Sequence, residues 1–306
     1  MKNFALSMAV VLCLSGVIYA GSIQTEDVSA DVKWVAHVDI ERFISSKIGG
    51  LILEELQAKG LEQKFAAFNE MFGFYPNKDL RSITLYGSKY KPHEGVVIVK
   101  GTFNKEKLLI LLRANDTHQE QSYKGRLVHK WVDKNKEHYG SFYKDDVIVI
   151  ADSEENIHEG LDVINGNSAN LAANAGLSDF RFAPAGAFFL AAAKGISEQA
   201  TVPPKAMILK MADRLLLVAG EVDGVDYIQV VLQARDETAA TQIQQMLQGI
   251  IAFGGLMGEQ NPMLAELAQA VQLTLNGTKV KMRLAQPTDK VFDFLKEMDA
   301  RKRRKK

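Results

Sequence analysis

Alternating apolar residues predict a strand over Trp34 to Ile40, and apolar residues at helical spacing follow it from Glu41 to about Phe72. A period of two is typical of a strand with one buried face, whereas recurrence every three to four residues is typical of an amphipathic helix. Glycines at positions 49, 50 and 60 are expected to interrupt the helical stretch. The folded part is therefore predicted to open with a strand and a broken helical region.

Short β-rich runs and helices are predicted to alternate up to residue 166. Asn104 is a good N-cap for a helix over Lys105 to Ala114, and Ser153 for a helix that Gly166 ends. The strands are predicted as a hairpin, 82–87 and 96–101, and a three-stranded meander, 127–132, 138–143 and 147–151.

The same order recurs in the second half of the chain. Adding 133 to a residue number between about 81 and 163 reaches a residue of similar type, as when Arg81 maps to Arg214 and Gly87 to Gly220. Such self-similarity indicates an internal duplication. The second set is a strand at 188–193, a hairpin of 215–221 and 227–234, a helix from 237 to about 253, strands at 271–276 and 279–285, and a final helix that Thr288 caps.

The predicted fold class is α+β. Each copy is expected to be a ferredoxin-like β-α-β-β-α-β unit with an extra strand and helix and an antiparallel-rich sheet, and the other copy is expected to cover its open face. The predicted division is a signal peptide 1–20, a linker 21–33, a first repeat 34–166, a connector 167–184, a second repeat 185–299 and a basic tail 300–306.

The first 20 residues have the pattern of a secretory signal. Lys2 provides the positive start, residues 4–17 the apolar stretch, and Ile18-Tyr19-Ala20 a small-residue cleavage site. A permanent anchor helix is the alternative, although the apolar run is shorter than the roughly 20 residues that a bilayer needs. We expect an exported protein of the periplasm or the extracellular space.

Cleavage would leave a chain without cysteine, because Cys13 is the single cysteine and lies in the signal. The mature chain then has no disulfide, no catalytic thiol and no Cys-ligated metal centre. Of the 37 basic residues, one lies in the signal and six in 301–306, which leaves 30 against 37 acidic ones. An acidic body thus carries a basic end.

His37 and Asp39 are candidates for chemistry because residues two apart on a strand share a face. They also have no polar counterpart near Leu190 and Ala192 of the second copy. The pair could be a general base with its orienting acid, or two metal ligands. The competing interpretation is structural: Asp39 caps the helix that starts at Glu41, and His37 is partly buried and hydrogen-bonded to it.

His129 and His138 lie on strands joined by the turn at 133–136. If Val132 pairs with Glu137, His138 lies opposite Trp131 and diagonal to His129, within reach of a shared divalent metal. Two ligands do not complete a site, and a solvated hairpin face is the alternative. Trp131 could stack on a sugar ring or be buried.

Two further segments could contact a surface. Residues 246–258 are apolar and glycine-studded, which suits a membrane-active loop or, alternatively, the close packing and end of a helix. The basic run could bind an anionic lipid or another phosphate-rich surface, or be a frayed solubilising end. It consists of Arg301, Lys302, Arg303, Arg304, Lys305 and Lys306.

The strand Trp34-Val35-Ala36-His37-Val38-Asp39 and the step Lys47-Ile48-Gly49-Gly50 resemble the opening of uncharacterised secreted bacterial proteins with a duplicated α/β pattern. That resemblance implies no particular activity.

Distinctive catalytic and nucleotide motifs are absent, including G-x-S-x-G, H-E-x-x-H, G-x-x-x-x-G-K-[ST] and G-x-G-x-x-G. The sequence favours an exported, non-catalytic binding or scaffold protein of the envelope. It implies no cofactor, and no specific nucleic-acid signal is seen. The alternatives are a hydrolase or metal-dependent enzyme centred on His37 and Asp39, and a membrane-surface adaptor that uses the basic tail.

Overall fold

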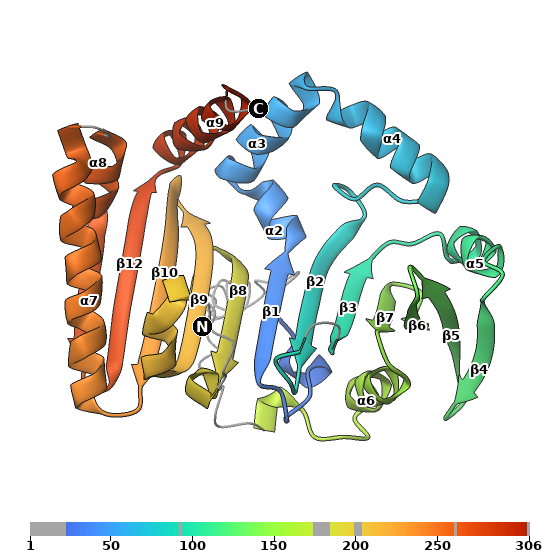
Figure 1. Cartoon of the computed structure of the whole chain (residues 1–306). Coiled ribbons are helices and arrows are strands. Elements are labelled where there is room, and N and C mark those ends of the chain that lie inside the picture. The colour runs from blue at the N-terminus through green and yellow to red at the C-terminus, as the bar shows by residue number, and fades with distance from the viewer. Residues whose placement is uncertain (1–22, 92–93, 174–183, 199–203, 260–261, 305–306) are drawn as a thin grey trace, which may run out of the picture.

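The computed structural model describes residues 23–91, 94–173, 184–198, 204–259 and 262–304. Within them, one antiparallel sheet of 12 strands has the order β11-β12-β10-β9-β8-β1-β2-β3-β7-β6-β5-β4 (Figure 1). The strands are β1 Trp34–Asp39, β2 Leu80–Gly87, β3 Val96–Gly101, β4 Gln119–Tyr123, β5 Arg126–Asp133, β6 Lys136–Lys144, β7 Val147–Ala151, β8 Ala187–Lys194, β9 Ala212–Val222, β10 Val225–Ala234, β11 Val271–Asn276 and β12 Lys279–Pro287.

The helices also follow the predicted order, except that the helix over Pro262–Ala270 was not predicted. Side chains of Asp39, Ser46, Asn104, Ser153 and Asp236 accept hydrogen bonds from backbone N–H groups in the first turns of the helices that follow them. The α-helices are α2 Ile40–Ser45, α3 Lys47–Ala58, α4 Leu61–Phe72, α5 Lys105–Arg113, α6 Glu154–Ile164, α7 Glu237–Leu256, α8 Pro262–Ala270 and α9 Thr288–Arg304. The short 3-10 helices are η1 Thr25–Asp27, η2 Leu171–Ala173, η4 Ile196–Glu198, η5 Pro204–Met211 and η6 Met257–Glu259.

One expected break in the first helical region is in the wrong place. Gly49 and Gly50 lie inside α3, and the chain breaks instead at Ser46, whose extended backbone ends α2 and whose side chain caps α3. A Cβ atom at Gly49 would lie 1.8 Å from the carbonyl oxygen of Phe43. This glycine therefore permits the close approach of two helices.

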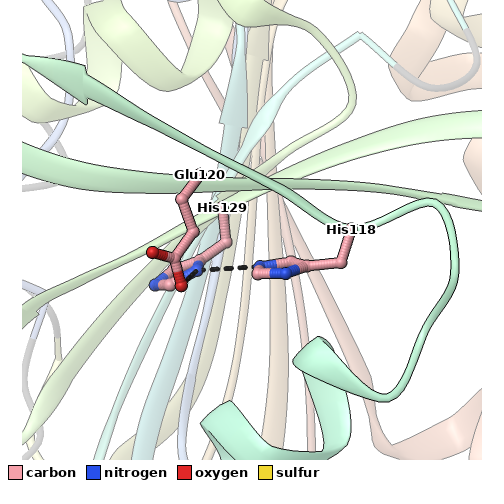
Figure 2. Close-up of side chains that lie close together, drawn as sticks. All are labelled: His118, Glu120 and His129. Carbon is pink, nitrogen blue, oxygen red and sulfur yellow. Dashed lines mark hydrogen bonds and ion pairs between the residues drawn. The ribbon is translucent and has the colours of Figure 1, made fainter.

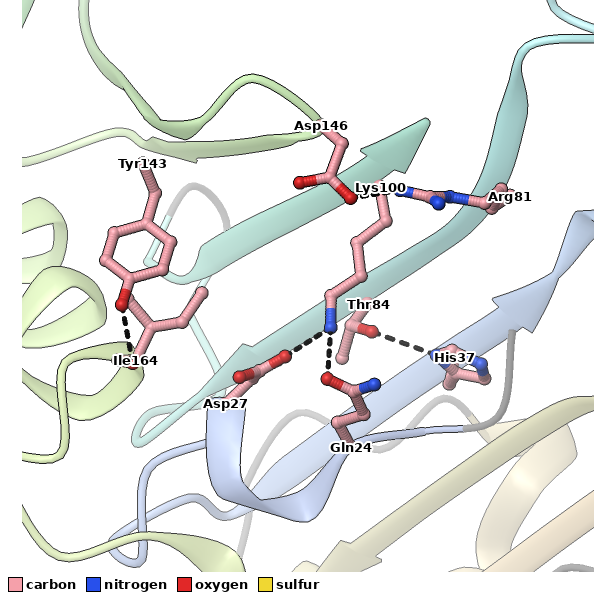
Figure 3. A network of polar contacts seen from close by, with 9 residues as sticks. All are labelled: Gln24, Asp27, His37, Arg81, Thr84, Lys100, Tyr143, Asp146 and Ile164. Atoms are coloured by element: carbon pink, nitrogen blue, oxygen red, sulfur yellow. Dashed lines mark hydrogen bonds and ion pairs between the residues drawn. The ribbon is translucent and has the colours of Figure 1, made fainter. Parts of the chain in front are cut away.

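One face of the sheet carries the main core. Strand β1 alternates half-buried and fully buried side chains, so that Val35 points to this face. This face of the sheet is covered by α6 and by residues 23–33, in which Val28 and Val32 are buried. Lys100 of β3 forms an ion pair with Asp27 of the same segment (Figure 3). The segment expected to be a linker is thus packed against the body.

A second, smaller core lies under α7. Ala240 and Ile243 of this helix are fully buried against Leu232 of β10 and Val280 of β12. The half-sheet formed by β8 to β12 therefore has its own helical cover.

The two halves join edge to edge, which corrects the expectation that each copy covers the other's open face. Strands β1 and β8 pair antiparallel at the middle of one continuous sheet. The ferredoxin-like order is also not seen, because β1 pairs directly with β2 and β8 with β9. A split β-α-β unit would place a further strand between such partners. The meandering connections leave no room for one.

Helices from opposite ends of the chain also meet at the top of Figure 1, where α3 packs against α9. Lys47 of α3 forms an ion pair of 2.7 Å with Asp289 of α9. The carboxylate of Glu221, on β9, accepts hydrogen bonds from the backbone N–H groups of Lys47 and Ile48 at 3.0 and 2.8 Å. We call the paired strands β1 and β8, where the two halves meet, the seam. Because Glu221 of the second half caps the first turn of α3, this helix is held over the seam.

None of the helices in the described part of the chain is long and apolar enough to cross a membrane. The predicted signal peptide, with Cys13, falls outside the described residues, and so does most of the predicted connector.

Candidate functional site: an apolar cavity where the halves meet

A cavity of about 570 Å³ lies beside the seam, between the ends of β9, β10 and β12 and helices α2, α3, α8 and α9. Its volume is in the range of about 300 to 1,000 Å³ that small-molecule sites occupy. Residues of both halves line it: Phe43, Ile48 and Ile52 from the first, and Phe188, Ala219, Gly220, Asp226, Tyr227, Ile228, Met263, Glu266, Leu267, Leu284, Gln286, Lys290, Val291, Asp293, Phe294, Leu295 and Glu297 from the second.

The walls of this cavity are mainly apolar. The rings of Phe43 and Phe188 meet edge to face, with centroids 5.2 Å apart, and bring an aromatic side chain from each half to the same wall. Lys290 of α9 and Glu266 of α8 form an ion pair among the lining residues. The apolar walls suit an alkyl or aromatic group of a ligand. The charged side chains of Lys290 and Glu266 are exposed and lie at the solvent-facing margin of the cavity.

A buried carboxylate interrupts the apolar lining. Asp226, at the start of β10, is 9% exposed, and neither carboxylate oxygen makes a hydrogen bond of good geometry. Burial is the main cause that raises the pKa of Asp226 to about 6, and the charge of Glu221 adds to it. The fully buried hydroxyl of Thr288 is its side-chain donor, in a poorly aligned contact that lowers the pKa of Asp226. Thr288 is the first residue of α9, and its hydroxyl makes no well-formed capping bond, so the predicted cap is wrong. A buried acid whose one side-chain donor is poorly aligned is costly, so a ligand group that donates a hydrogen bond would stabilise it.

The structure places His37 and Asp39 on the buried face of β1, with exposed fractions of 5% and 2%. The expected cap is present: the backbone N–H of Arg42 donates to Asp39 Oδ1 at 2.8 Å, and the helix begins at Ile40, one residue earlier than predicted. His37 Nδ1 lies 2.9 Å from the hydroxyl oxygen of Thr84, its cross-strand neighbour (Figure 3). Burial raises the pKa of Asp39, and the hydrogen bonds and charge of Arg42 partly offset this rise.

A small cavity of about 140 Å³ lies beside this pair. Arg42 is the other ionisable side chain that lines it, and the remaining lining is apolar or backbone. The volume is well below the roughly 300 Å³ of the smallest ordinary ligand sites and is enough for a few water molecules. This geometry suits a helix cap better than a catalytic centre.

The register predicted for the β5–β6 hairpin is confirmed, with Val132 opposite Glu137 and Trp131 opposite His138. The two histidines nevertheless engage different partners. His138 Nδ1 lies 2.9 Å from Asp152 Oδ1, and its ring stacks on half-buried Trp131. His129 is directed toward β4 instead.

His129 lies in a cluster with His118 and Glu120 (Figure 2). Glu120 of β4 is the cross-strand partner of His129, and His118 precedes β4 on the same face. Burial lowers the pKa of His129, whereas hydrogen bonds from Arg113 lower the pKa of Glu120. His118 and Glu120 were not among the candidates from the sequence, because β4 was not predicted. The residues of this strand are mostly polar and exposed.

The two remaining candidate segments are largely helical. Of residues 246–258, those up to Leu256 belong to α7, and a Cβ at Gly258 would lie 2.9 Å from the Cβ of Ala265 on α8. Close helix packing, one of the two expected roles, thus explains this glycine. The basic run continues α9 as far as Arg304, and Lys305 and Lys306 lie outside the described residues.

Asp226 was also not anticipated from the sequence. The signal available was an acid two residues after the turn Asp223-Gly224, facing an otherwise apolar strand end. Its burial depends on α9, which returns to cover it from the far end of the chain.

Comparisons with known proteins show limited likeness. No family model matches, and no curated protein matches. Among solved structures, crystal form III of TP0453 is similar at a TM-score of 0.49 and 7% identity, covering 89% of this chain and 97% of that one. Crystal form I gives 0.49 at 8% identity over 90% and 97%, and form IV gives 0.46 at 9% identity over 92% and 99%. Likeness at this level carries no argument about function.

Proposed function

We propose that this protein is an exported, non-catalytic binding protein of the envelope that holds an amphiphilic small molecule in the cavity beside the seam. The observation that carries the proposal is the cavity of about 570 Å³ with apolar walls from both halves. Export rests on the signal pattern of residues 1–20.

Asp226 defines the polar end of the expected ligand. The alkyl or aromatic part of the ligand would lie against Phe43, Phe188 and Phe294, and a hydroxyl or amine would reach Asp226. A donor is required because a carboxylate can only accept, and at neutral pH the deprotonated form prevails. A ligand with a carboxylate in the same place would be repelled.

An internal duplication accounts for how such a cavity arises. The sheet order β1-β2-β3-β7-β6 matches β8-β9-β10-β12-β11, and helices α5 and α7 follow equivalent hairpins. The first half then adds β5 and β4, whereas the second adds α8, a wall of the cavity. We propose that the halves diverged at this insertion after duplication.

Binding can be tested with N-phenyl-1-naphthylamine, an apolar fluorescent amine. We expect saturable binding of one molecule per chain, with Ala219→Phe weakening it at least ten-fold because the added ring fills the cavity. Ala191→Phe is the matched control, since Ala191 is a half-buried alanine of the neighbouring strand outside the lining. Equal binding by the wild type and both variants would refute the site.

A second candidate function, contact with a membrane surface, is supported by α7. Met246, Ile250, Phe253 and Leu256 form a stripe at helical spacing with exposed fractions of 43, 63, 64 and 81%. No charged residue occurs between positions 238 and 258. This stripe and the basic tail 301–306 suit an interfacial contact with anionic lipid.

Flotation with phosphatidylglycerol vesicles tests this candidate. Phe253→Ser with Leu256→Ser should reduce the bound fraction at least ten-fold, since burial of each side chain contributes about 1.5 to 3 kcal/mol. Deletion of 301–306 should make the remaining binding insensitive to salt. Unchanged flotation of the double variant would remove this candidate.

A further inference from the structure

Two histidines and a glutamate converge at the far edge of the sheet, on the β4–β5 hairpin (Figure 2). Nitrogen atoms of His118 and His129 and a carboxylate oxygen of Glu120 all lie within 4.8 Å of one another. His118 is half-buried, Glu120 is exposed and His129 is 2% exposed. From this juxtaposition we propose a binding site for a divalent transition metal, of which Zn²⁺ is the main candidate.

The spacing of the three atoms is close to what a metal requires. With bonds of about 2.0 to 2.1 Å, neighbouring ligands of a tetrahedral ion lie about 3.3 Å apart. His118 Nε2 lies 3.1 Å from His129 Nδ1, which lies 3.7 Å from Glu120 Oε1. Rotation of the two less buried side chains, His118 and Glu120, adjusts the third distance.

The ligand types also match. Imidazole nitrogen and carboxylate oxygen are the donors that Zn²⁺ accepts in open sites with three protein ligands and a solvent position. Glu120 is exposed, which leaves room for a water molecule as the fourth ligand. His118 Nε2 and His129 Nδ1 share one hydrogen bond, so one of them carries a hydrogen. On binding, this hydrogen moves to the other nitrogen of the same ring, and the ion replaces it between two neutral imidazoles.

The surroundings fix the carboxylate over the buried imidazole. Arg113, the last residue of α5, donates to Glu120 Oε1 from Nε at 3.0 Å and from Nη2 at 2.8 Å. Because both hydrogen bonds end on Oε1, a metal ion would displace one of them or bind Oε2, and the remaining contact would orient the carboxylate. Arg113 and Lys105 are cations near His129. Their positive charge repels a metal cation and lowers the affinity of the site.

The test is titration of the chain, free of any polyhistidine tag, with Zn²⁺ alone, and with Co²⁺ for its visible spectrum. We expect one ion per chain and a Co²⁺ spectrum with nitrogen ligation. His118→Ala and Glu120→Gln should each weaken binding at least ten-fold while the circular dichroism spectrum stays unchanged, since both positions are less buried than His129. His158→Ala is the control, because its ring stacks on Tyr123 outside the cluster.

Absence of Zn²⁺ binding by the wild type would overturn the proposal. Equal loss in His158→Ala would also overturn it, because binding would then be unspecific. A loss in His138→Ala as large as in His118→Ala would instead assign the metal to the hairpin pair His129 and His138. This cluster and the apolar cavity lie in different halves of the sheet, so the outcome is independent of the proposed function.

Discussion

Replacing Asp226 by asparagine should stabilise the protein at neutral pH, because it removes a carboxylate that is charged and buried there. In the folded protein the pKa of Asp226 is about 6, against 3.8 as its ordinary value. In the unfolded chain the proton is lost near pH 3.8, so between these values the folded state holds more protons. The free energy of unfolding therefore falls as pH rises through this window, and the loss is complete above the folded-state pKa.

The magnitude follows from the distance between the two pKa values. A difference of about 2 pH units corresponds to about 3 kcal/mol at 1.36 kcal/mol per unit. An asparagine side chain at this position would be neutral at every pH. Asp226→Asn should therefore gain about 1 to 3 kcal/mol at about pH 7.5 and almost nothing at about pH 4, where Asp226 is itself protonated. Relaxation of the site places the expected gain below the full value.

Urea denaturation of the wild type and the variant from about pH 4 to about pH 8 measures this difference. Other groups titrate alike in both proteins, so their contributions cancel. Asp223→Asn is the matched control, because Asp223 is exposed at the tip of the same hairpin and makes the same change of charge. A gain that does not depend on pH, or no gain at neutral pH, would refute the reasoning about a buried carboxylate.

Three further predictions concern the cap, a turn and export. Asp39→Ala should cost about 1 kcal/mol of stability, whereas Asp39→Asn keeps the acceptor for the Arg42 N–H and should stay close to wild type. Loss of an enzymatic activity in Asp39→Ala without a change in stability would favour the catalytic alternative. Gly186→Ala should cost more than about 2 kcal/mol because its φ is +72° and its Cβ would lie 1.8 Å from a backbone oxygen, whereas Gly224→Ala, at φ +74° in open space, should cost about 1 to 2 kcal/mol. Equal thermal shifts for these two glycine variants would contradict the packing argument. N-terminal sequencing of the mature protein should begin at Gly21, and an intact Met1 in the soluble fraction would contradict export.

Local structure could be predicted where one physical rule dominates. Strand β1 shows the alternation of a half-buried strand, and Asn104 and Ser153 cap the helices predicted for them. Strand β4 was missed because its residues Gln119 to Ser122 include no apolar residue, so no hydrophobic period marks it. The turn Lys124-Gly125, with φ of 47° and 79°, was the available signal.

The candidate sites depend on contacts that the sequence order conceals. Glu120 meets His129 only because the β4–β5 hairpin places them opposite each other. Asp226 lies between β9 and β12, and its burial depends on α9, which packs back on β10 and β12 from the end of the chain. Pairing edge to edge and pairing face to face both bury apolar surface, so periodicity alone could not decide between them.

Mass spectrometry of the protein purified without detergent from its native cells tests the central claim most directly. We predict one amphiphile per chain, with an alkyl or aromatic part and a hydroxyl or amine, present in the wild type and in Ala191→Phe and absent from Ala219→Phe. A wild-type protein that carries no small molecule, or a molecule that both variants retain equally, would contradict the account.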